Sequence, residues 1–169
     1  QAIIGNMISP DTPYTRHHCN MQTGVGKTHA GIQSAMRFIP VFKKIYSIQA
    51  TKVAGNKAGV LELDRSTPSV FIIGFAGTKA AFMRDLIFTP SYGFTTPTEL
   101  EELNRRRKSI SLGEEYLKSY KDYYNWIRKR VTNKSKGGFF KFYGYDEFAL
   151  ALFNSKEPLT TYEEETARR

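Results

Sequence analysis

The most regular hydrophobic pattern lies in the second half of the chain, where large apolar and aromatic residues recur every three to four positions. The positions are Leu117, Tyr120, Tyr124, Ile127 and Val131. This period is typical of an amphipathic helix with one buried face, so it predicts a helix that ends near residue 131 and packs against a core. Residues 111–114 read Ser-Leu-Gly-Glu, a capping box that predicts where this helix begins.

A second capping box occupies residues 96–99, with proline at the first helical position. It predicts a helix through Leu100 and Leu103 into the basic run 105–108.

Two segments have the composition of strands. Residues 69–75 form a continuous apolar run ahead of a glycine turn, which predicts a buried parallel strand. The turn at 76–79 should lead into a helix over 80–88, where apolar residues have i, i+4 spacing. After the break at Gly137-Gly138, the aromatic run 139–145 predicts another strand.

The pattern in the N-terminal half is less regular. Residues 14–22 should form a strand that feeds a glycine-rich loop, although they are more polar than a buried parallel strand usually is. We expect the helix that follows, over 29–38, to end before Pro40. β-Branched and aromatic residues at 41–50 then indicate a strand, and glycines within 51–63 indicate a loop or weak hairpin.

The main candidate for chemistry is the segment from Met21 to Thr28, Met-Gln-Thr-Gly-Val-Gly-Lys-Thr. Its second half has the spacing Gly-x-Gly-Lys-Thr of a phosphate-binding loop. Glycines at 24 and 26 let the backbone pass close to a phosphate with its N–H groups directed inward. Lys27 can then reach the β- and γ-phosphates, and the Thr28 hydroxyl can bind Mg²⁺.

We therefore expect this loop to bind ATP and Mg²⁺, with Lys27 and Thr28 as catalytic residues and Thr28 as the metal ligand. The residues expected to contact the nucleotide are Thr23, Gly24, Val25, Gly26, Lys27, Thr28 and His29. The following helix would direct the positive end of its dipole at the same anion. Met21 stands where the general motif has glycine, a departure that suits the helicase type of loop. The other interpretation is a chance Gly/Lys/Thr turn before a helix.

Thr78 and Lys79 lie at the turn after the apolar strand. A hydroxyl, a backbone N–H or a lysine at such a turn can hold a nucleic-acid phosphate. The simpler interpretation is that Thr78 caps the next helix.

Asp146-Glu147 is the only Asp-Glu pair in the chain. A helicase-type ATPase needs an apolar strand that ends in Asp-Glu, where aspartate holds Mg²⁺ and glutamate positions water. However, the run before the pair contains Gly144 and no aliphatic residue, and the residues after it resemble the first turn of a helix with Asp146 as N-cap. Both interpretations remain open, and the pattern favours the helix start.

Lysine and arginine total 25 against 16 aspartate and glutamate, so the 169-residue chain carries a formal charge of +9. Such an excess attracts polyanions through counterion release, but a solvated basic surface explains it equally well. The basic run 128–130, with Lys134 and Lys136, also suits the C-terminus of a helix.

His17, His18 and Cys19 have no second ligand pair at zinc spacing, so we expect a structural role for them. The single cysteine excludes an internal disulfide, and no run approaches the roughly 20 apolar residues of a membrane span. The chain begins without methionine and ends in a charged stretch, which suggests a fragment of a longer protein.

Several motifs together resemble a known family. They are Thr12-Pro13-Tyr14, the loop 23–28, the strand and turn 70–79, Tyr92-Gly93-Phe94 and the aromatic block 142–148. They look like the superfamily-two DNA/RNA helicases of nucleocytoplasmic large DNA viruses, which include the poxvirus early transcription factor small subunit and its giant-virus and asfarvirus relatives. The likeness covers most of residues 1–155.

The resemblance implies a P-loop NTPase of the RecA-like type, a three-layer α/β fold with an incomplete parallel sheet and flanking helices. It implies ATP and Mg²⁺ at Gly24, Gly26, Lys27 and Thr28, and nucleic acid at 78–79. The family's Asp-Glu motif follows the aromatic block, which supports the helix-start interpretation of the later acidic pair. The family's motifs II to VI are absent, so we expect the isolated chain to be inactive.

We expect residues 1–155 to form the front part of the first ATP-binding domain and 156–169 to be a charged tail. The intact protein should be an ATP-dependent helicase that acts on DNA or RNA, with a viral RNA polymerase or transcription factor as partner and no membrane, in the virion or host cytoplasm. The alternatives are another P-loop phosphoryl-transfer enzyme, such as a nucleotide kinase, and a basic nucleic-acid-binding module with a vestigial loop.

Overall fold

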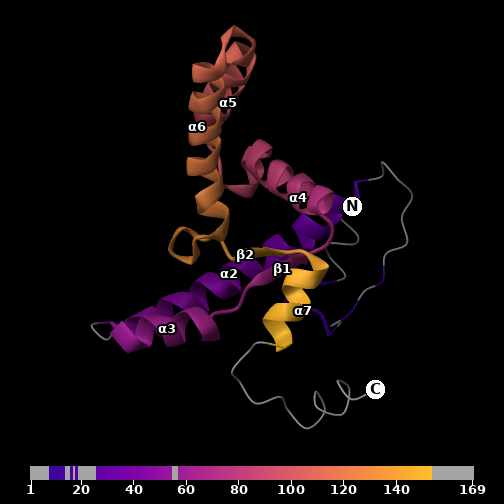
Figure 1. Cartoon of the computed structure of the whole chain (residues 1–169). Helices are drawn as coiled ribbons and strands as arrows, with labels where there is room; N and C mark the ends of the chain where they lie inside the picture. Colours follow the sequence, from indigo (N-terminus) through magenta and orange to yellow (C-terminus); the bar gives the residue numbers. More distant parts are fainter. Residues whose placement is uncertain (1–7, 14–15, 17, 19–25, 55–56, 154–169) are drawn as a thin grey trace.

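The computed structural model describes residues 8–13, 16, 18, 26–54 and 57–153 of the chain (Figure 1). The helices are α2 (Lys27–Val53), α3 (Lys57–Ser66), α4 (Ala76–Phe88), α5 (Pro97–Lys108), α6 (Glu114–Thr132) and α7 (Tyr145–Phe153), and the strands are β1 (Val70–Ile73) and β2 (Phe140–Tyr143). Short 3₁₀ helices lie at Pro90–Tyr92, Ser109–Leu112 and Lys134–Lys136. The described part is therefore mixed α/β and mostly helical, which confirms the predicted class at this coarse level. The predicted domain boundary after residue 155 lies outside the described residues.

β1 and β2 pair in parallel, with Val70 opposite Phe140 and Ile72 opposite Phe142. Side chains alternate between the two faces of a strand, so these four residues share one face. That face packs on the core: Phe140 is fully buried and Ile72 nearly so. The strands predicted at 69–75 and 139–145 are confirmed, and so is the parallel direction of the sheet.

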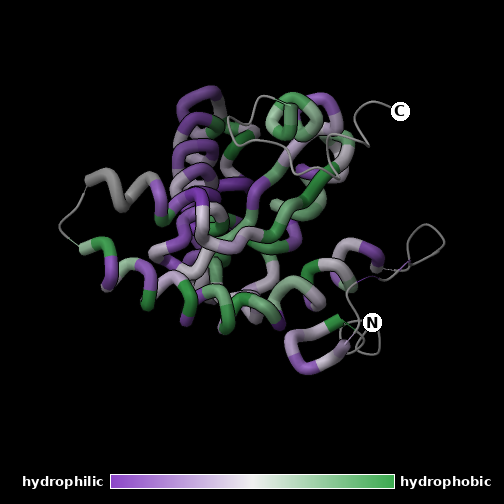
Figure 2. Tube along the Cα trace, turned by 90° about the horizontal axis from the view of Figure 1, so that it is seen from below, coloured by the Kyte–Doolittle hydropathy of each residue, from purple (hydrophilic) through white to green (hydrophobic). Residues whose placement is uncertain are grey.

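The opposite face of the sheet is only partly covered. Phe71 is 51% exposed. Its ring contacts Tyr143 of β2, with a centroid distance of 5.9 Å, and Phe148 of α7, with a centroid distance of 6.1 Å. After its acidic first turn, α7 consists of hydrophobic residues (Figure 2), and Phe153 at its end is 70% exposed. The prediction that residues 69–75 are a buried strand is correct for one face only.

Helix α2 continues through Pro40, so the predictions of a helix end before Pro40 and of a strand at 41–50 are wrong. Proline inside a helix costs about 3 kcal/mol because it removes an N–H donor and crowds the preceding turn. Here Pro40 is exposed, and Phe42 and Tyr46 beyond it pack edge-on against Phe139 with ring centroids 5.7 and 6.2 Å away. This burial of the helix face outweighs the local cost of the proline.

The loop or weak hairpin predicted at 51–63 is also wrong, because α2 extends into this segment and α3 begins within it. Long-range contacts stabilise α3: Leu63 is buried, and Lys134 donates hydrogen bonds to the carbonyl and carboxylate oxygens of Asp64 at 2.7 and 2.9 Å. The hydrogen bond from Lys134 lowers the pKa of Asp64. The glycines of this segment predicted a turn. The helix is instead stabilised by Lys134, which lies 70 residues beyond its partner Asp64 and could not be recognised from the local sequence.

The core is built from the inner face of the sheet and from helices α2, α4, α5 and α6. The largest fully buried side chains are Phe139, Phe140, Ile32, Leu86, Ile87, Leu103, Ile127 and Val131. The predicted core face of α6 is confirmed, since Ile127 and Val131 are 0% exposed and Tyr120 and Tyr124 pack beside them. None of the helices in the described ranges is long and apolar enough to cross a membrane.

Helices α5 and α6 lie side by side and project away from the sheet (Figure 1). The capping box of α5 is confirmed: Glu99 N–H donates to the Thr96 hydroxyl at 3.2 Å, and Thr96 N–H donates to the Glu99 carboxylate at 2.9 Å. The predicted end of α6 near residue 131 is also confirmed, but the helix begins at Glu114 and its N-cap is Gly113 without a side-chain bond. The capping role predicted for Ser111 is therefore wrong.

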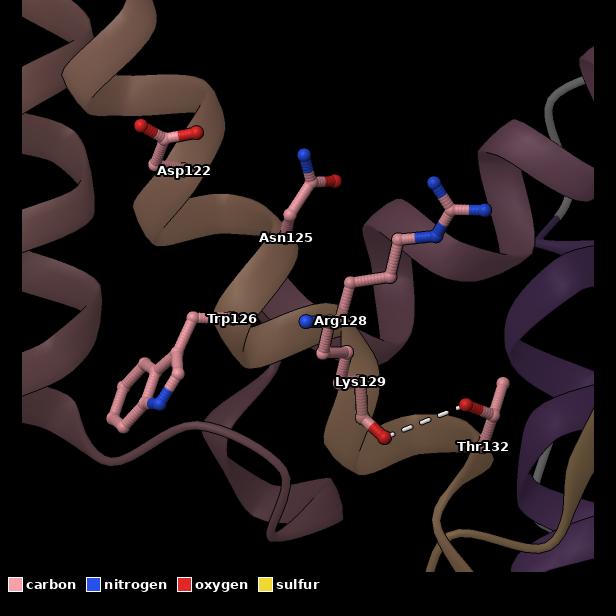
Figure 3. Close-up of a pocket in the computed structure, with 6 residues that line it drawn as sticks. All are labelled: Asp122, Asn125, Trp126, Arg128, Lys129 and Thr132. Carbon is pink, nitrogen blue, oxygen red and sulfur yellow. Dashed lines mark hydrogen bonds between the residues drawn. The ribbon is translucent and has the colours of Figure 1, made fainter.

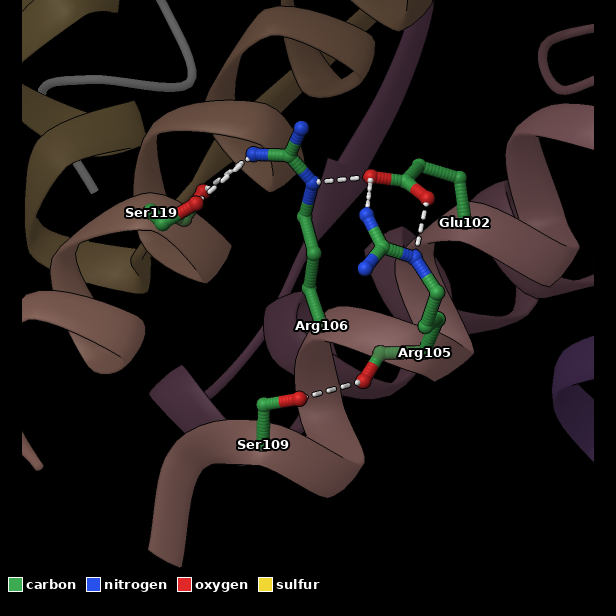
Figure 4. A network of polar contacts seen from close by, with 5 residues as sticks. All are labelled: Glu102, Arg105, Arg106, Ser109 and Ser119. Carbon is green, nitrogen blue, oxygen red and sulfur yellow. Dashed lines mark hydrogen bonds and ion pairs between the residues drawn. The ribbon is translucent and has the colours of Figure 1, made fainter. Parts of the chain in front are cut away.

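An arginine network holds the two helices together. Arg105 and Arg106 share the carboxylate of Glu102 at 2.7 Å, and Arg106 also donates to the carbonyl and hydroxyl oxygens of Ser119 on α6 (Figure 4). The hydrogen bonds from Arg105 and then Arg106 hold the pKa of Glu102 at about 2. Nearby, Arg130 of α6 donates two hydrogen bonds to Glu99 of α5, at 2.6 and 2.9 Å.

Replacing Glu99 with glutamine should reduce stability by about 1–2 kcal/mol at neutral pH, because the cap is kept and the charge that pairs with Arg130 is lost. The hydrogen bond from Arg130 lowers the folded-state pKa of Glu99 below its ordinary 4.5. Its stabilisation is therefore present above pH 4.5 and is lost as the pH falls through the lowered value. Urea unfolding across this pH range should show the two proteins converging in acid. Glu101→Gln, an exposed change on the same helix, is the control, and a pH-independent difference would contradict the assignment.

The predicted break at Gly137-Gly138 is confirmed and has two causes. Gly137 has φ 81°, in the left-handed region that favours glycine. A Cβ on Gly138 would overlap the backbone of Arg130 and Val131, so β2 can approach the end of α6 only with glycine there.

We expect Gly138→Ala to destabilise the protein by about 1–3 kcal/mol, because backbone must move to admit the methyl group. Gly77→Ala is the matched control, since a Cβ there meets nothing within 4 Å. In the first turn of α4 it should be neutral or stabilising by less than about 1 kcal/mol. Equal thermal stability of the two variants would refute the close approach at Gly138.

Candidate phosphate-binding site

Gly26, Lys27 and Thr28 form the junction between the glycine-rich segment and α2, while Thr23, Gly24 and Val25 lie outside the described residues. The strand expected at 14–22 is described only at positions 16 and 18. Gly26 has φ 81° and ψ 34°, in the left-handed region. Its carbonyl accepts a hydrogen bond from the Ala30 N–H at 3.0 Å. One glycine of the motif thus occupies a backbone conformation that favours glycine.

The N-terminus of α2 has no side-chain cap and no acidic residue in its first turn. The first N–H groups of a helix lack intrahelical partners, so these can interact with an anion, which the helix dipole also favours. Lys27 is exposed and belongs to none of the ion pairs between described residues. Thr28 is partly buried beside it.

His29 fixes this first turn against the neighbouring elements. Its Nδ1 lies 2.9 Å from the Tyr92 hydroxyl, and its Nε2 lies 3.9 Å from the Asp85 carboxylate of α4. Burial raises the pKa of Tyr92, and the charge of Asp85 adds to the effect. The side chain of His29 therefore positions the helix start, while its backbone N–H remains in the first turn.

Sequence reasoning did not find Asp85, and it found Tyr92 only as part of the motif Tyr92-Gly93-Phe94, with no role at the start of α2. Tyr92 is 63 residues from His29, so no local signal indicates this contact.

Thr78 and Lys79 lie in the first turn of α4, which begins at Ala76, so the predicted start at residue 80 is too late. The N-cap is Phe75 without a side-chain bond, so the interpretation of Thr78 as the cap is wrong. Lys79 Nζ lies 3.0 Å from the carboxylate of Glu147 in α7.

Asp146 and Glu147 lie in the first turn of α7, which confirms the helix-start interpretation. The N-cap role predicted for Asp146 is wrong, because the helix already begins at Tyr145. Glu147 accepts a hydrogen bond from the Gly144 N–H at 2.6 Å. This bond, with a second from Lys79, lowers the pKa of Glu147. Within the described ranges, no cluster of three or more His, Cys, Asp or Glu side chains could hold a metal ion.

The parallel strands bring these two helix starts to one edge of the sheet. α4 follows β1 and α7 follows β2, so both helices begin at the carboxyl edge, and the Lys79–Glu147 pair joins them. Ligands of open α/β sheets bind outside this edge. A phosphate that approached Lys79 would have to compete with the carboxylate of Glu147.

The known proteins to which this chain is similar are viral transcription factors. The chain is homologous to a segment of the early transcription factor large subunit homolog of African swine fever virus. The protein of isolate Tick/South Africa/Pretoriuskop Pr4/1996 is 30% identical over 158 residues, which cover 91% of this chain and 12% of that protein. The protein of isolate Tick/Malawi/Lil 20-1/1983 is also 30% identical over 158 residues, covering 91% of this chain and 13% of its own length. No family model matches the chain, and no solved structure matches it.

The chain thus spans about one eighth of the length of these relatives. Their name confirms the resemblance to transcription proteins of large DNA viruses, but it specifies the large subunit, whereas the motifs suggested the small one.

Proposed function

We propose that this chain is the nucleotide-binding part of a nucleic-acid-dependent ATPase that serves viral transcription. The observation that carries the proposal is the left-handed Gly26 at the start of α2, directly before Lys27 and Thr28. A phosphate-binding loop requires flexible backbone, free N–H groups and a lysine in this order. The homology to a viral early transcription factor supports the transcriptional role.

In the proposed site, the N–H groups of the first turn of α2 hold the phosphate oxygens. Lys27 contributes a mobile ammonium group that stabilises charge on the transferred phosphoryl. The Thr28 hydroxyl offers an oxygen of the kind that Mg²⁺ prefers, and the ion, when bound, would neutralise charge on the β- and γ-phosphates. The contacts of His29 with Tyr92 and Asp85 position these groups without touching the nucleotide.

We assign nucleic-acid contact to the carboxyl edge of the sheet, through Thr78 and Lys79. The ion pair with Glu147 would then be exchanged for a phosphate contact. Hydrolysis requires carboxylates that Asp146 and Glu147 do not provide, since they begin α7 and one of them is bound to Lys79. We therefore place the hydrolytic carboxylates, and the partner viral RNA polymerase or transcription factor, with the intact protein.

A second candidate is a basic nucleic-acid-binding module with a vestigial loop. The helix-start role of Asp146-Glu147 favours it. The pair then provides no carboxylates for hydrolysis, and a protein that only binds nucleic acid requires none.

Equilibrium binding of a fluorescent ATP analogue, measured with Mg²⁺ and with or without single-stranded DNA or RNA, tests the proposal. Nucleotide binding that responds to nucleic acid supports it. Nucleotide binding that ignores nucleic acid indicates another P-loop enzyme, and nucleic-acid binding without nucleotide binding indicates the vestigial module.

A further inference from the structure

The basic residues at the end of α6 fall into two groups. Some form ion pairs with described residues, and others form none. Arg130 pairs with Glu99 and lies over the Trp126 ring, 4.1 Å from its centroid. Lys134 pairs with Asp64. Arg128 and Lys129, by contrast, are exposed and take no part in the ion pairs between described residues.

The two unpaired cations line a hollow of about 500 Å³ along the outer face of α6 (Figure 3). Its lining residues are Asp122, Asn125, Trp126, Arg128, Lys129 and Thr132. Asn125, Arg128, Lys129 and Thr132 are related by steps of three or four residues, whereas Trp126 projects from the other side of the hollow, three residues before Lys129 (Figure 3). All of them lie away from the buried Ile127 and Val131. Lys118 and Lys121 continue the exposed basic character toward the start of α6. This surface is called the α6 basic face below.

Trp126 gives the α6 basic face an aromatic component. It is 50% exposed, and its ring is held by Arg130 and by Tyr123, whose ring is stacked at a centroid distance of 5.6 Å. Tyr123 in turn lies under Arg106 of α5, 4.6 Å from its guanidinium carbon. An exposed indole fixed in this way loses little side-chain entropy when a ligand packs against it.

We propose that the α6 basic face binds a strand of nucleic acid. Arg128 and Lys129 contact the phosphates, Asn125 and Thr132 offer polar groups beside them, and a base packs on the exposed part of Trp126. A strand that crosses α6 would meet Trp126 on one side, Lys129 three residues further on, and Arg128 on the other side. Single strands are bound by such a combination of cations and an exposed aromatic ring. Asp122 repels phosphate, so the contacts concentrate at the C-terminal end of the hollow.

An acidic protein segment is the competing ligand for a basic surface. The exposed tryptophan favours nucleic acid, because stacking on a ring adds affinity for bases and adds none for carboxylates. The site goes beyond the proposed function, since it uses neither the start of α2 nor the edge with Lys79. Loss of nucleotide binding would leave it untouched, and its own failure would leave the nucleotide site untouched.

The test measures binding of short labelled single-stranded DNA and RNA to the full chain by anisotropy, between about 50 and 200 mM salt. Arg128→Gln with Lys129→Gln should weaken binding roughly 10- to 30-fold at 0.1 M salt and flatten the slope of log K against log salt by about 1.4, because two phosphate contacts are lost. Trp126 is the only tryptophan in the chain, so its fluorescence should change when the strand binds.

Lys44→Gln with Lys52→Gln removes the same charge from exposed positions of α2 and is the control. Circular dichroism establishes that each variant is folded. Equal losses in both double variants, an unchanged salt slope, or a Trp126 spectrum that ignores the strand would overturn the proposal. Tighter binding of polyglutamate than of either nucleic acid would overturn it in favour of an acidic protein partner.

Discussion

Replacing Lys27 with alanine should weaken ATP-analogue binding roughly 10- to 100-fold, since hydrogen bonds to charged groups contribute about 1.5–3 kcal/mol. Lys27 is exposed and takes part in none of the ion pairs between described residues, so its removal breaks none of these pairs. Thermal stability should therefore stay unchanged while affinity falls. This separation of binding from stability is what distinguishes a ligand-binding lysine from a structural one.

The matched control is Lys44→Ala, which removes the same side chain from an exposed position of the same helix. It lowers the net charge equally but should leave nucleotide affinity unchanged. If both variants lost affinity to the same extent, the effect would be one of overall charge. If Lys27→Ala bound the analogue as tightly as the wild type, the phosphate-loop assignment would be wrong.

Local signals predicted the elements whose cause is local. The capping box at Thr96 and Glu99 satisfies helix N–H groups from within four residues, and the structure contains it as predicted. The apolar period of α6 gave its core face, and the two apolar runs gave the parallel strands. The acidic pair at Asp146-Glu147 was recognisable as a helix start from the residues that follow it.

The errors occur where long-range contacts outweigh local preference. Pro40 indicates a helix end, but Phe42 and Tyr46 are held in α2 by Phe139, about 95 residues further along the chain, and such packing commonly overrides propensity. The sequence also could not show which residues of the basic run 128–130 form ion pairs, because the partner of Arg130 is Glu99 on another helix. At the proposed nucleotide site, the sequence indicates Lys27 and Thr28, but the contacts of the next residue, His29, come from Asp85 of α4 and from Tyr92 in the 3₁₀ helix after it.

Replacing Phe140 with alanine should have the largest effect on stability. Phe140 is 0% exposed, lies at the start of β2, and contacts Phe94 edge-on at 6.0 Å and Phe142 at 6.4 Å. Removing a buried phenylalanine ring loses its transfer free energy and leaves a cavity, at a cost of about 3–5 kcal/mol. Since domains of this size are stable by about 5–15 kcal/mol, the variant should unfold at a much lower urea concentration.

Phe153→Ala is the control, because that ring is 70% exposed at the end of α7 and its removal should change stability by less than about 0.5 kcal/mol. Urea unfolding followed by circular dichroism compares the two variants directly. Because Val70 and Phe140 are paired across the sheet, loss of Phe140 should also loosen β1, and amide exchange of both strands should rise together. Similar unfolding midpoints for the two variants would show that the parallel pair is not the centre of the core.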